Sequence, residues 1–131
     1  MKTKKIWANL AVSDLERTTK FYTEIGFKPN GTSDELTSFT VGLDDFVIHF
    51  FTIDKLQESL KGGLADLQHG NEIVFTLGAY NKGEVDDWEK EIKKAGGKII
   101  SSAEEFGEGY YGFDFSDPDG HRFNVFYMEG L

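Results

Sequence analysis

Three side chains that could do chemistry lie in three stretches where apolar and polar residues alternate. They are His49 in 46–52, Glu72 in 71–78 and Asn124 in 122–128. An imidazole and a carboxylate can bind metal ions or exchange protons, and an amide can form hydrogen bonds. Successive residues of a strand point to opposite faces, so each of these side chains is expected opposite the apolar, core-forming face of its strand.

The segment 117–121, Asp-Pro-Asp-Gly-His, predicts a tight turn between two aromatic strands, 111–115 and 122–128. Proline presets one turn angle and glycine supplies a positive φ, so the turn fixes the register of the hairpin. The second strand then places Asn124 and Phe126 on the face away from the core. We expect His121 to be a solvated turn residue.

The first half of the chain predicts a strand, a helix and three further strands. The helix is expected from Asp14 to about Ile25, with Ser13 as its N-cap, Glu16 at capping-box spacing and Gly26 after its end. The strands are expected at 6–12, 27–30, 35–42 and 46–52. A connection with a short helical turn should cover 53–67.

The second half predicts the same order. Strands are expected at 71–78, 98–101, 109–115 and 122–128, with a helix at 83–95. The remaining acidic segment around Phe106 is expected to be a surface loop or a lid, and it contains Glu104, Glu105 and Glu108. We therefore predict an α+β fold of two βαβββ modules, about 1–60 and about 68–131, that share one pseudo-twofold core within a single domain, 1–131.

Composition restricts the partners. The 131 residues include 14 basic and 23 acidic ones, and the net charge of −9 disfavours nucleic acid and anionic membranes. There is no cysteine, so the chain has neither disulfides nor thiolate chemistry. The longest apolar stretches are strand-sized and no secretory signal opens the chain, so we expect a cytoplasmic protein that does not span a membrane.

Three motifs stand in a fixed order along the two modules. They are Val12-x-Asp14-Leu15-Glu16, Phe21-Tyr22-x-x-Ile25-Gly26-Phe27 and Asp117-Pro118-Asp119-Gly120-His121. In this order and spacing they resemble the vicinal oxygen chelate superfamily, which contains glyoxalase I, extradiol dioxygenases, fosfomycin-resistance enzymes and bleomycin-binding proteins. The resemblance covers nearly the whole chain and implies that the sheets curl into a cup, with the helices on its convex side. It indicates the fold and not the reaction.

The resemblance also implies where a metal ion would lie in metal-dependent members. Their ligands, commonly His, Glu, His and Glu, come from the first and last strands of both modules. The corresponding residues here are Trp7, His49, Glu72 and Asn124. Trp7 cannot coordinate a metal and Asn124 offers only a neutral carbonyl oxygen, so His49 and Glu72 are the only competent candidates. Two ligands rarely hold an ion against water, and no cofactor is firmly implied.

We therefore expect a small-molecule-binding protein of the glyoxalase/bleomycin-resistance type with a degenerate metal site. Its predicted cup is lined by Trp7, Asn9, His49, Phe51, Glu72, Asn124 and Phe126. Bleomycin-binding members, the aromatic lining and the negative charge together favour an organic ligand that is cationic and aromatic. The aromatic residues could equally be plain filling of the cup.

The alternative is an enzyme, a glyoxalase-like lyase or isomerase related to lactoylglutathione lyase. Glu72 would act as its base, with or without a divalent metal. A carboxylate simply paired with His49 or Arg122 is the other interpretation of Glu72. We also expect a homodimer, because superfamily members often pair modules between chains and sheet edges need cover.

Overall fold

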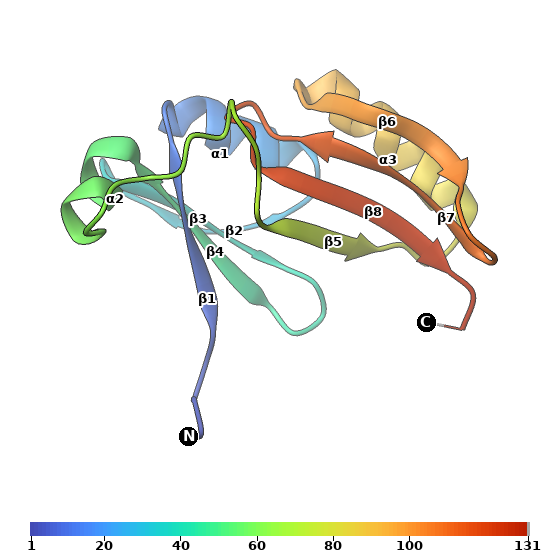
Figure 1. Ribbon diagram of the computed structural model, residues 1–131, viewed down its shortest axis with the longest axis horizontal. Helices are drawn as coiled ribbons and strands as arrows, with labels where there is room; N and C mark the ends of the chain where they lie inside the picture. The colour runs from blue at the N-terminus through green and yellow to red at the C-terminus, as the bar shows by residue number, and fades with distance from the viewer. Residues whose placement is uncertain (131) are drawn as a thin grey trace. The chain divides into compact units, whose positions relative to one another are not determined.

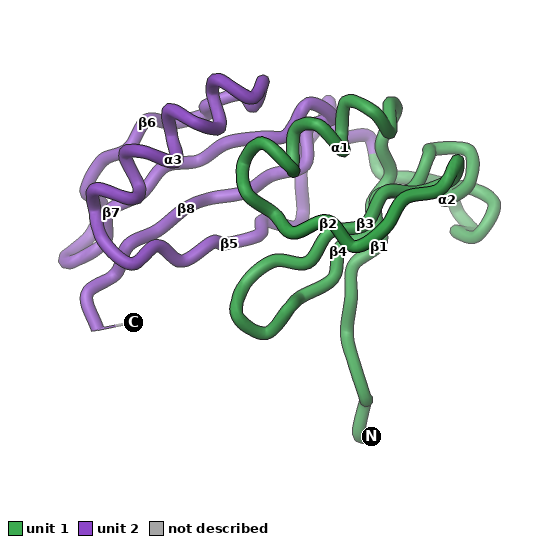
Figure 2. The backbone as a smooth tube through the Cα atoms, turned by 180° about the vertical axis from the view of Figure 1, so that it is seen from behind, with its two compact units in different colours: residues 1–65 green, residues 66–131 purple. Residues whose placement is uncertain are grey.

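The computed structural model describes residues 1–130, and the chain divides after Ala65 into two compact units (Figure 2). Each unit contains one four-stranded sheet, with the order β1-β4-β3-β2 in unit 1 and β5-β8-β7-β6 in unit 2. The predicted α+β fold with two similar modules is therefore confirmed. Among the described residues, no helix is long and apolar enough to cross a membrane.

Unit 1 follows the predicted order closely (Figure 1). Strand β4 lies between β1, with which it pairs in parallel, and β3, with which it pairs antiparallel. A parallel pair needs a long crossover, and the segment from α1 to β3 supplies it. The elements are β1 (Trp7–Val12), α1 (Leu15–Glu24), β2 (Lys28–Thr32), β3 (Leu36–Val41), β4 (Phe46–Thr52) and α2 (Ile53–Ser59).

The N-cap of helix α1 lies one residue later than predicted. Asp14, not Ser13, is the N-cap, because the Asp14 side chain accepts a hydrogen bond of 3.0 Å from the backbone N–H of Arg17. The Ser13 hydroxyl instead accepts a hydrogen bond from the Arg17 guanidinium. The predicted end of the helix is confirmed, since Gly26 adopts a φ of +97° directly after the C-cap.

The core of unit 1 lies between α1 and one face of its sheet. Phe21 and Tyr22 on the helix are almost fully buried, and the Tyr22 ring stacks on Phe50 of β4 at 4.4 Å between centroids. Phe39 of β3 lies beside both rings. This aromatic packing fixes which face of the sheet receives the helix, and it thereby fixes the direction of every side chain on the opposite face.

Unit 2 repeats the arrangement with α3 against its sheet. Its core contains Phe113, Phe115, Phe123 and Val125 from the strands and Val85 and Ile92 from the helix. The Phe115 and Phe123 rings stack at 5.1 Å. The elements are β5 (Val74–Gly78), α3 (Lys82–Ala95), β6 (Lys98–Glu105), β7 (Tyr110–Ser116) and β8 (Arg122–Met128).

Two boundaries in unit 2 differ from the prediction. Strand β5 begins at Val74, which pairs with Arg122, the first residue of β8. Glu72 therefore lies before the strand, where β8 offers no further residue to pair with. Strand β6 continues to Glu105, because Glu104 and Glu105 pair with Gly112 and Tyr111 of β7. The predicted acidic loop is thus reduced to a short hairpin connection.

The turn at 117–121 has the predicted form, but His121 is buried and not solvated. One oxygen of Asp117 accepts hydrogen bonds from the backbone N–H groups of Asp119 and His121, and the other lies 2.8 Å from His121 Nδ1. Gly120 supplies the positive φ of +101°. The turn motif alone does not predict this burial, because it depends on the contact between the His121 imidazole and the Asp117 carboxylate.

Candidate functional site

In each unit one face of the sheet packs against a helix, and we call the opposite face the open face. Alternation along β1 and β4 places four predicted site residues on the open face of unit 1, because Ile48 and Phe50 point to the helix. In unit 2 the same argument applies to β8, where Phe123 and Val125 form the core. The predicted site residues on the open faces are Trp7, Asn9, His49 and Phe51 in unit 1 and Asn124 and Phe126 in unit 2.

His49 occupies the middle of the open face of unit 1. Its register partners are Asn9 on β1 and Ser38 on β3. The imidazole ring lies 5.9 Å from the Phe51 ring in an edge-to-face arrangement. Its Nδ1 atom is buried and has no hydrogen-bond partner among residues 1–130. Trp7 is half-exposed on the same face. The unpaired His49 nitrogen therefore shares this face with two aromatic side chains, Trp7 and Phe51.

Asn124 occupies the corresponding place in unit 2. It lies between Thr76 on β5 and Asp114 on β7 in register. Its Oδ1 atom is buried and, within the described part of the chain, unpaired. Asp114 is half-buried, and sequence reasoning missed it as a site residue. Its alternation with the buried Phe113 and Phe115 could have revealed that its carboxylate points to the open face.

Aromatic rings cover the other end of the open face of unit 2. The Phe126 ring lies over Gly112, where a Cβ atom would collide with it. The Phe106 ring lies 4.7 Å from Phe126 and 6.1 Å from Tyr110. Sequence reasoning had placed Phe106 in a surface loop and had not singled out Tyr110. The three rings together form an aromatic surface that we call the ring shelf: Phe106, Tyr110 and Phe126.

Glu72 differs from the other predicted site residues. It is exposed, it precedes β5, and it makes no hydrogen bond or ion pair with any residue in 1–130. Its backbone is therefore not held by the strand ladder that positions Asn124. A carboxylate at this place is accessible to a ligand, but nothing in its own unit orients it.

The side chains present do not form a ligand set for a divalent metal. In the described residues, no three His, Cys, Asp or Glu side chains are grouped so that they could hold an ion. The neighbours of His49 in register are an amide and a hydroxyl, which are weak metal ligands. At the first predicted ligand position, Trp7 has an indole N–H that only donates. The donor set thus does not fit the metal centre that the resemblance implies.

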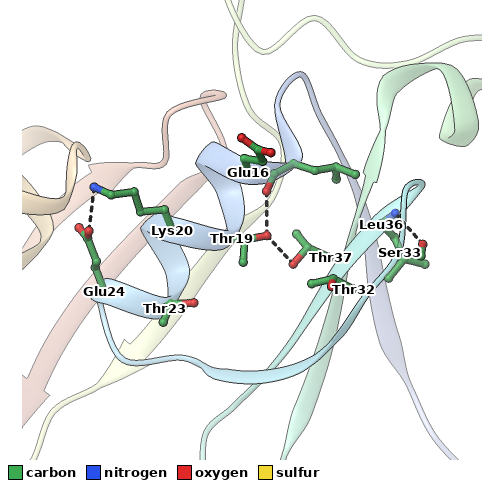
Figure 3. A pocket seen from close by; sticks show the side chains of 10 residues that line it. Glu16, Thr19, Lys20, Thr23, Glu24, Thr32, Ser33, Leu36 and Thr37 are labelled. Atoms are coloured by element: carbon green, nitrogen blue, oxygen red, sulfur yellow. Dashed lines mark hydrogen bonds and ion pairs between the residues drawn. The ribbon is translucent and has the colours of Figure 1, made fainter.

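A hollow in unit 1 lies on the helix side, between α1 and the β2–β3 hairpin (Figure 3). Its volume is about 600 Å³, and threonines form much of its wall. The Thr19 hydroxyl bonds to the Leu15 carbonyl oxygen at 2.7 Å and to the Thr37 hydroxyl at 2.8 Å. Lys20 and Glu24 form an exposed ion pair at its rim. These groups satisfy one another, in contrast to the unpaired His49 nitrogen on the open face.

The sequence of this chain matches a family of known proteins. The sequence profile of the Glyoxalase/Bleomycin resistance protein/Dioxygenase superfamily matches residues 6–125. The chain belongs to this superfamily. The resemblance drawn from the sequence motifs is therefore confirmed. Among curated proteins, none matches the chain.

Solved structures show the same fold. A hypothetical protein from S. aureus is 29% identical, with a TM-score of 0.85 over 97% of this chain and 95% of its own. A glyoxalase-related enzyme from Fulvimarina pelagi is 22% identical, with a TM-score of 0.82 over 95% and 88%. Lactoylglutathione lyase from Agrobacterium tumefaciens is 18% identical, with a TM-score of 0.70 over 96% and 95%. At such identities the two enzymes show a shared fold alone.

Proposed function

We propose that this superfamily member is a small-molecule-binding protein in which the open face of a unit holds an organic ligand without a metal ion. One observation carries the proposal: each open face contains a buried polar atom without a partner in residues 1–130, His49 Nδ1 in unit 1 and Asn124 Oδ1 in unit 2. Leaving such an atom unpaired costs about 1–3 kcal/mol. A ligand that supplies the missing hydrogen bonds removes this cost on binding.

The surroundings of these two atoms support an aromatic ligand. Trp7 and Phe51 share the open face with His49, and Phe126 shares the other with Asn124. Flat aromatic side chains give a ligand large contact areas and lose little conformational freedom on binding. The net charge of −9 attracts a cationic ligand and repels an anionic one. We therefore propose a ligand that is both aromatic and cationic.

The competing proposal is a glyoxalase-like lyase or isomerase with Glu72 as base. Three measurements separate the two: metal content of the purified protein, thermal shift with Ni, Zn, Mn and Fe, and hemithioacetal turnover in the presence of a chelator. We expect no stoichiometric metal, no metal-dependent shift and no turnover. A stoichiometric metal that is lost in Glu72→Ala would overturn the proposal. Turnover that persists with chelator and disappears in Glu72→Ala would assign Glu72 as a metal-free base.

We also propose that the protein is a homodimer. The terminal strands β1 and β5 of the two sheets begin with an exposed apolar residue, Trp7 or Val74, and each is preceded by another, Ile6 or Ile73. An uncovered strand edge with apolar side chains readily pairs with another chain. Light scattering across micromolar concentrations should give the mass of two chains, and a constant monomer mass would refute the dimer.

A further inference from the structure

Resting on the proposed function, we infer that the open face of unit 2 selects an aromatic ammonium ion. Its nitrogen would lie beside Asp114 and Asn124, and its aromatic group would lie against Phe106 and Phe126. We call these four residues the cation subsite. The inference assigns the part of the ligand that carries the charge, and it names Asp114 as the residue that recognises it.

The sheet register places the two halves of the cation subsite next to each other. Asp114 lies directly opposite Asn124, and Gly112 lies directly opposite Phe126. These pairs occupy successive positions on the same face, about 7 Å apart along the strands. A ligand with a short link between its ring and its ammonium group spans this spacing. Because Gly112 has no side chain, the Phe126 ring lies over that position of β7.

The polar half of the subsite contains a carboxylate and an unpaired carbonyl oxygen. Asp114 is half-buried and its carboxylate makes no hydrogen bond or ion pair with any described residue, and Asn124 Oδ1 is buried and unpaired. Thr76, in register on the other side of Asn124, adds an exposed hydroxyl. A carboxylate and a carbonyl oxygen side by side repel an anion. An ammonium group, which brings donors and a positive charge, satisfies both at once.

The aromatic half presents its rings to the same ligand. Phe106 and Phe126 meet at 51° with centroids 4.7 Å apart, while Phe106 and Tyr110 are nearly parallel at 24°. Phe106 and Tyr110 are each more than one-third exposed. Ring faces attract cations, and ring edges accommodate another aromatic group. Charge recognition at Asp114 and stacking on the ring shelf therefore favour the same molecule.

Two basic residues stand on this face, Arg122 and Lys98, which is in register with Ser116, and Arg122 provides the strongest objection. It lies one position beyond Asn124 along β8, on the side away from the ring shelf, and its Nε atom is buried and unpaired among residues 1–130. An anionic ligand would bind there. The two possibilities predict opposite charge preferences, because Asp114 flanks the ring shelf whereas Arg122 is separated from it by the Asp114–Asn124 pair.

Three probes of similar size and different charge decide between them: 2-phenylethylammonium, neutral 2-phenylethanol and 3-phenylpropionate. Each is titrated into the ¹⁵N-labelled full chain at pH 7 while the amide shifts of 114, 124 and 126 are followed. We expect 2-phenylethylammonium to bind at least tenfold more tightly than either other probe. Asp114→Asn should weaken its binding by about tenfold or more, since one partner of a desolvated charge pair is lost.

Asp87→Asn is the matched control, because it removes the same charge from an exposed position on α3, away from the open face. It should leave the affinity unchanged within about twofold. Equal binding of all three probes at these amides would overturn the cation subsite and leave the proposed function intact. Tighter binding of 3-phenylpropionate, or no shift with any probe, would also overturn it. The three probes are compared on the protein without substitutions, so this comparison tests the cation subsite even if Asp114→Asn fails to fold.

Discussion

The two units share their strand order and helix packing and differ on their open faces. In unit 1 the middle of the face is a row without a carboxylate, Asn9, His49 and Ser38. In unit 2 the same row is Thr76, Asn124 and Asp114, with Arg122 in the next row. Both rows contain one buried, unpaired polar atom, and only the second carries a half-buried carboxylate. The repeat therefore fixes the scaffold, while each unit supplies its own chemistry.

This difference separates stability from binding. Both units have almost fully buried aromatic side chains on the helix-facing side of the sheet, such as Phe50 in unit 1 and Phe123 in unit 2, so the free energy of folding should depend on them in a similar way. The open faces carry the groups with unsatisfied hydrogen bonds, so ligand affinity should depend on them in different ways. Four substitution experiments test which side chains stabilise each unit, and they are given from the largest expected effect to the smallest.

The largest effect should come from the two cores. Phe50→Ala in unit 1 and Phe123→Ala in unit 2 each remove a side chain with no exposed surface. We expect each to lower the free energy of unfolding by about 3–5 kcal/mol, because of the lost burial and the cavity left behind. Urea unfolding measures both. Phe51→Ala on the open face is the control, with a smaller loss. A loss below about 1 kcal/mol in one core only would break the similarity of the units.

The hairpin turns should differ more than the cores. Asp117→Ala removes the acceptor of two backbone N–H groups and of the His121 ring, at a side chain that is 1% exposed. We expect a loss of about 3 kcal/mol, because buried donors stay unpaired. Asp44→Ala, at an exposed position in the β3–β4 turn of unit 1, should change the unfolding free energy by less than about 0.5 kcal/mol. Equal losses would contradict this difference.

The ring shelf depends on a glycine. Gly112→Ala would place a Cβ against the Val125 carbonyl oxygen and the Phe126 ring, so the ring or the strand must move. We expect a loss of about 1–3 kcal/mol and altered NMR shifts of the Phe106 and Phe126 ring protons. Gly83→Ala in α3, where a Cβ meets only Asn81 Oδ1 at 3.3 Å, should be close to neutral. Unchanged ring shifts in Gly112→Ala would show that Phe126 does not rest on Gly112.

The smallest effect concerns Tyr111, whose hydroxyl donates a hydrogen bond to Asp86 at 2.5 Å. This bond, then burial and the negative charge of Asp86, raise the pKa of Tyr111 to about 12. The native state thus holds this proton more tightly than the unfolded chain, whose tyrosine pKa is about 10. The resulting stabilisation is complete below about pH 10 and disappears as the pH rises through 12. Absorbance titration should show one late tyrosine, which Asp86→Asn shifts towards lower pH.

The strands that alternate between core and open face could be predicted from the sequence. Those at 46–52 and 122–128 have the predicted bounds, because a turn precedes each strand and apolar residues recur with a period of two. The same pattern fails at Glu72, since alternation continues past the point where β8 can pair. A strand ends where its partner ends, and the sequence of one strand does not contain that information.

The candidate site was predictable on the strands and not at their connections. Alternation predicts that Phe51 and Phe126 lie on the open face, and the same alternation in β7 indicates Asp114. The prediction that His121 is solvated was wrong, because the burial of this residue depends on the Asp117 carboxylate four residues away. Phe106 could not be found by periodicity, since it lies just beyond β6 and is held by its contact with Phe126. The position of such a residue depends on its contacts with other parts of the structure, and the local sequence pattern does not predict these contacts.

The most direct test of a metal-free ligand-binding protein is native mass spectrometry of the freshly purified chain, compared with its denatured mass. We predict that the native species carries an added organic mass, which a Phe126→Ala, His49→Ala double variant retains less well. A native mass that exceeds the polypeptide by one divalent ion, or that equals the bare polypeptide, would contradict the account.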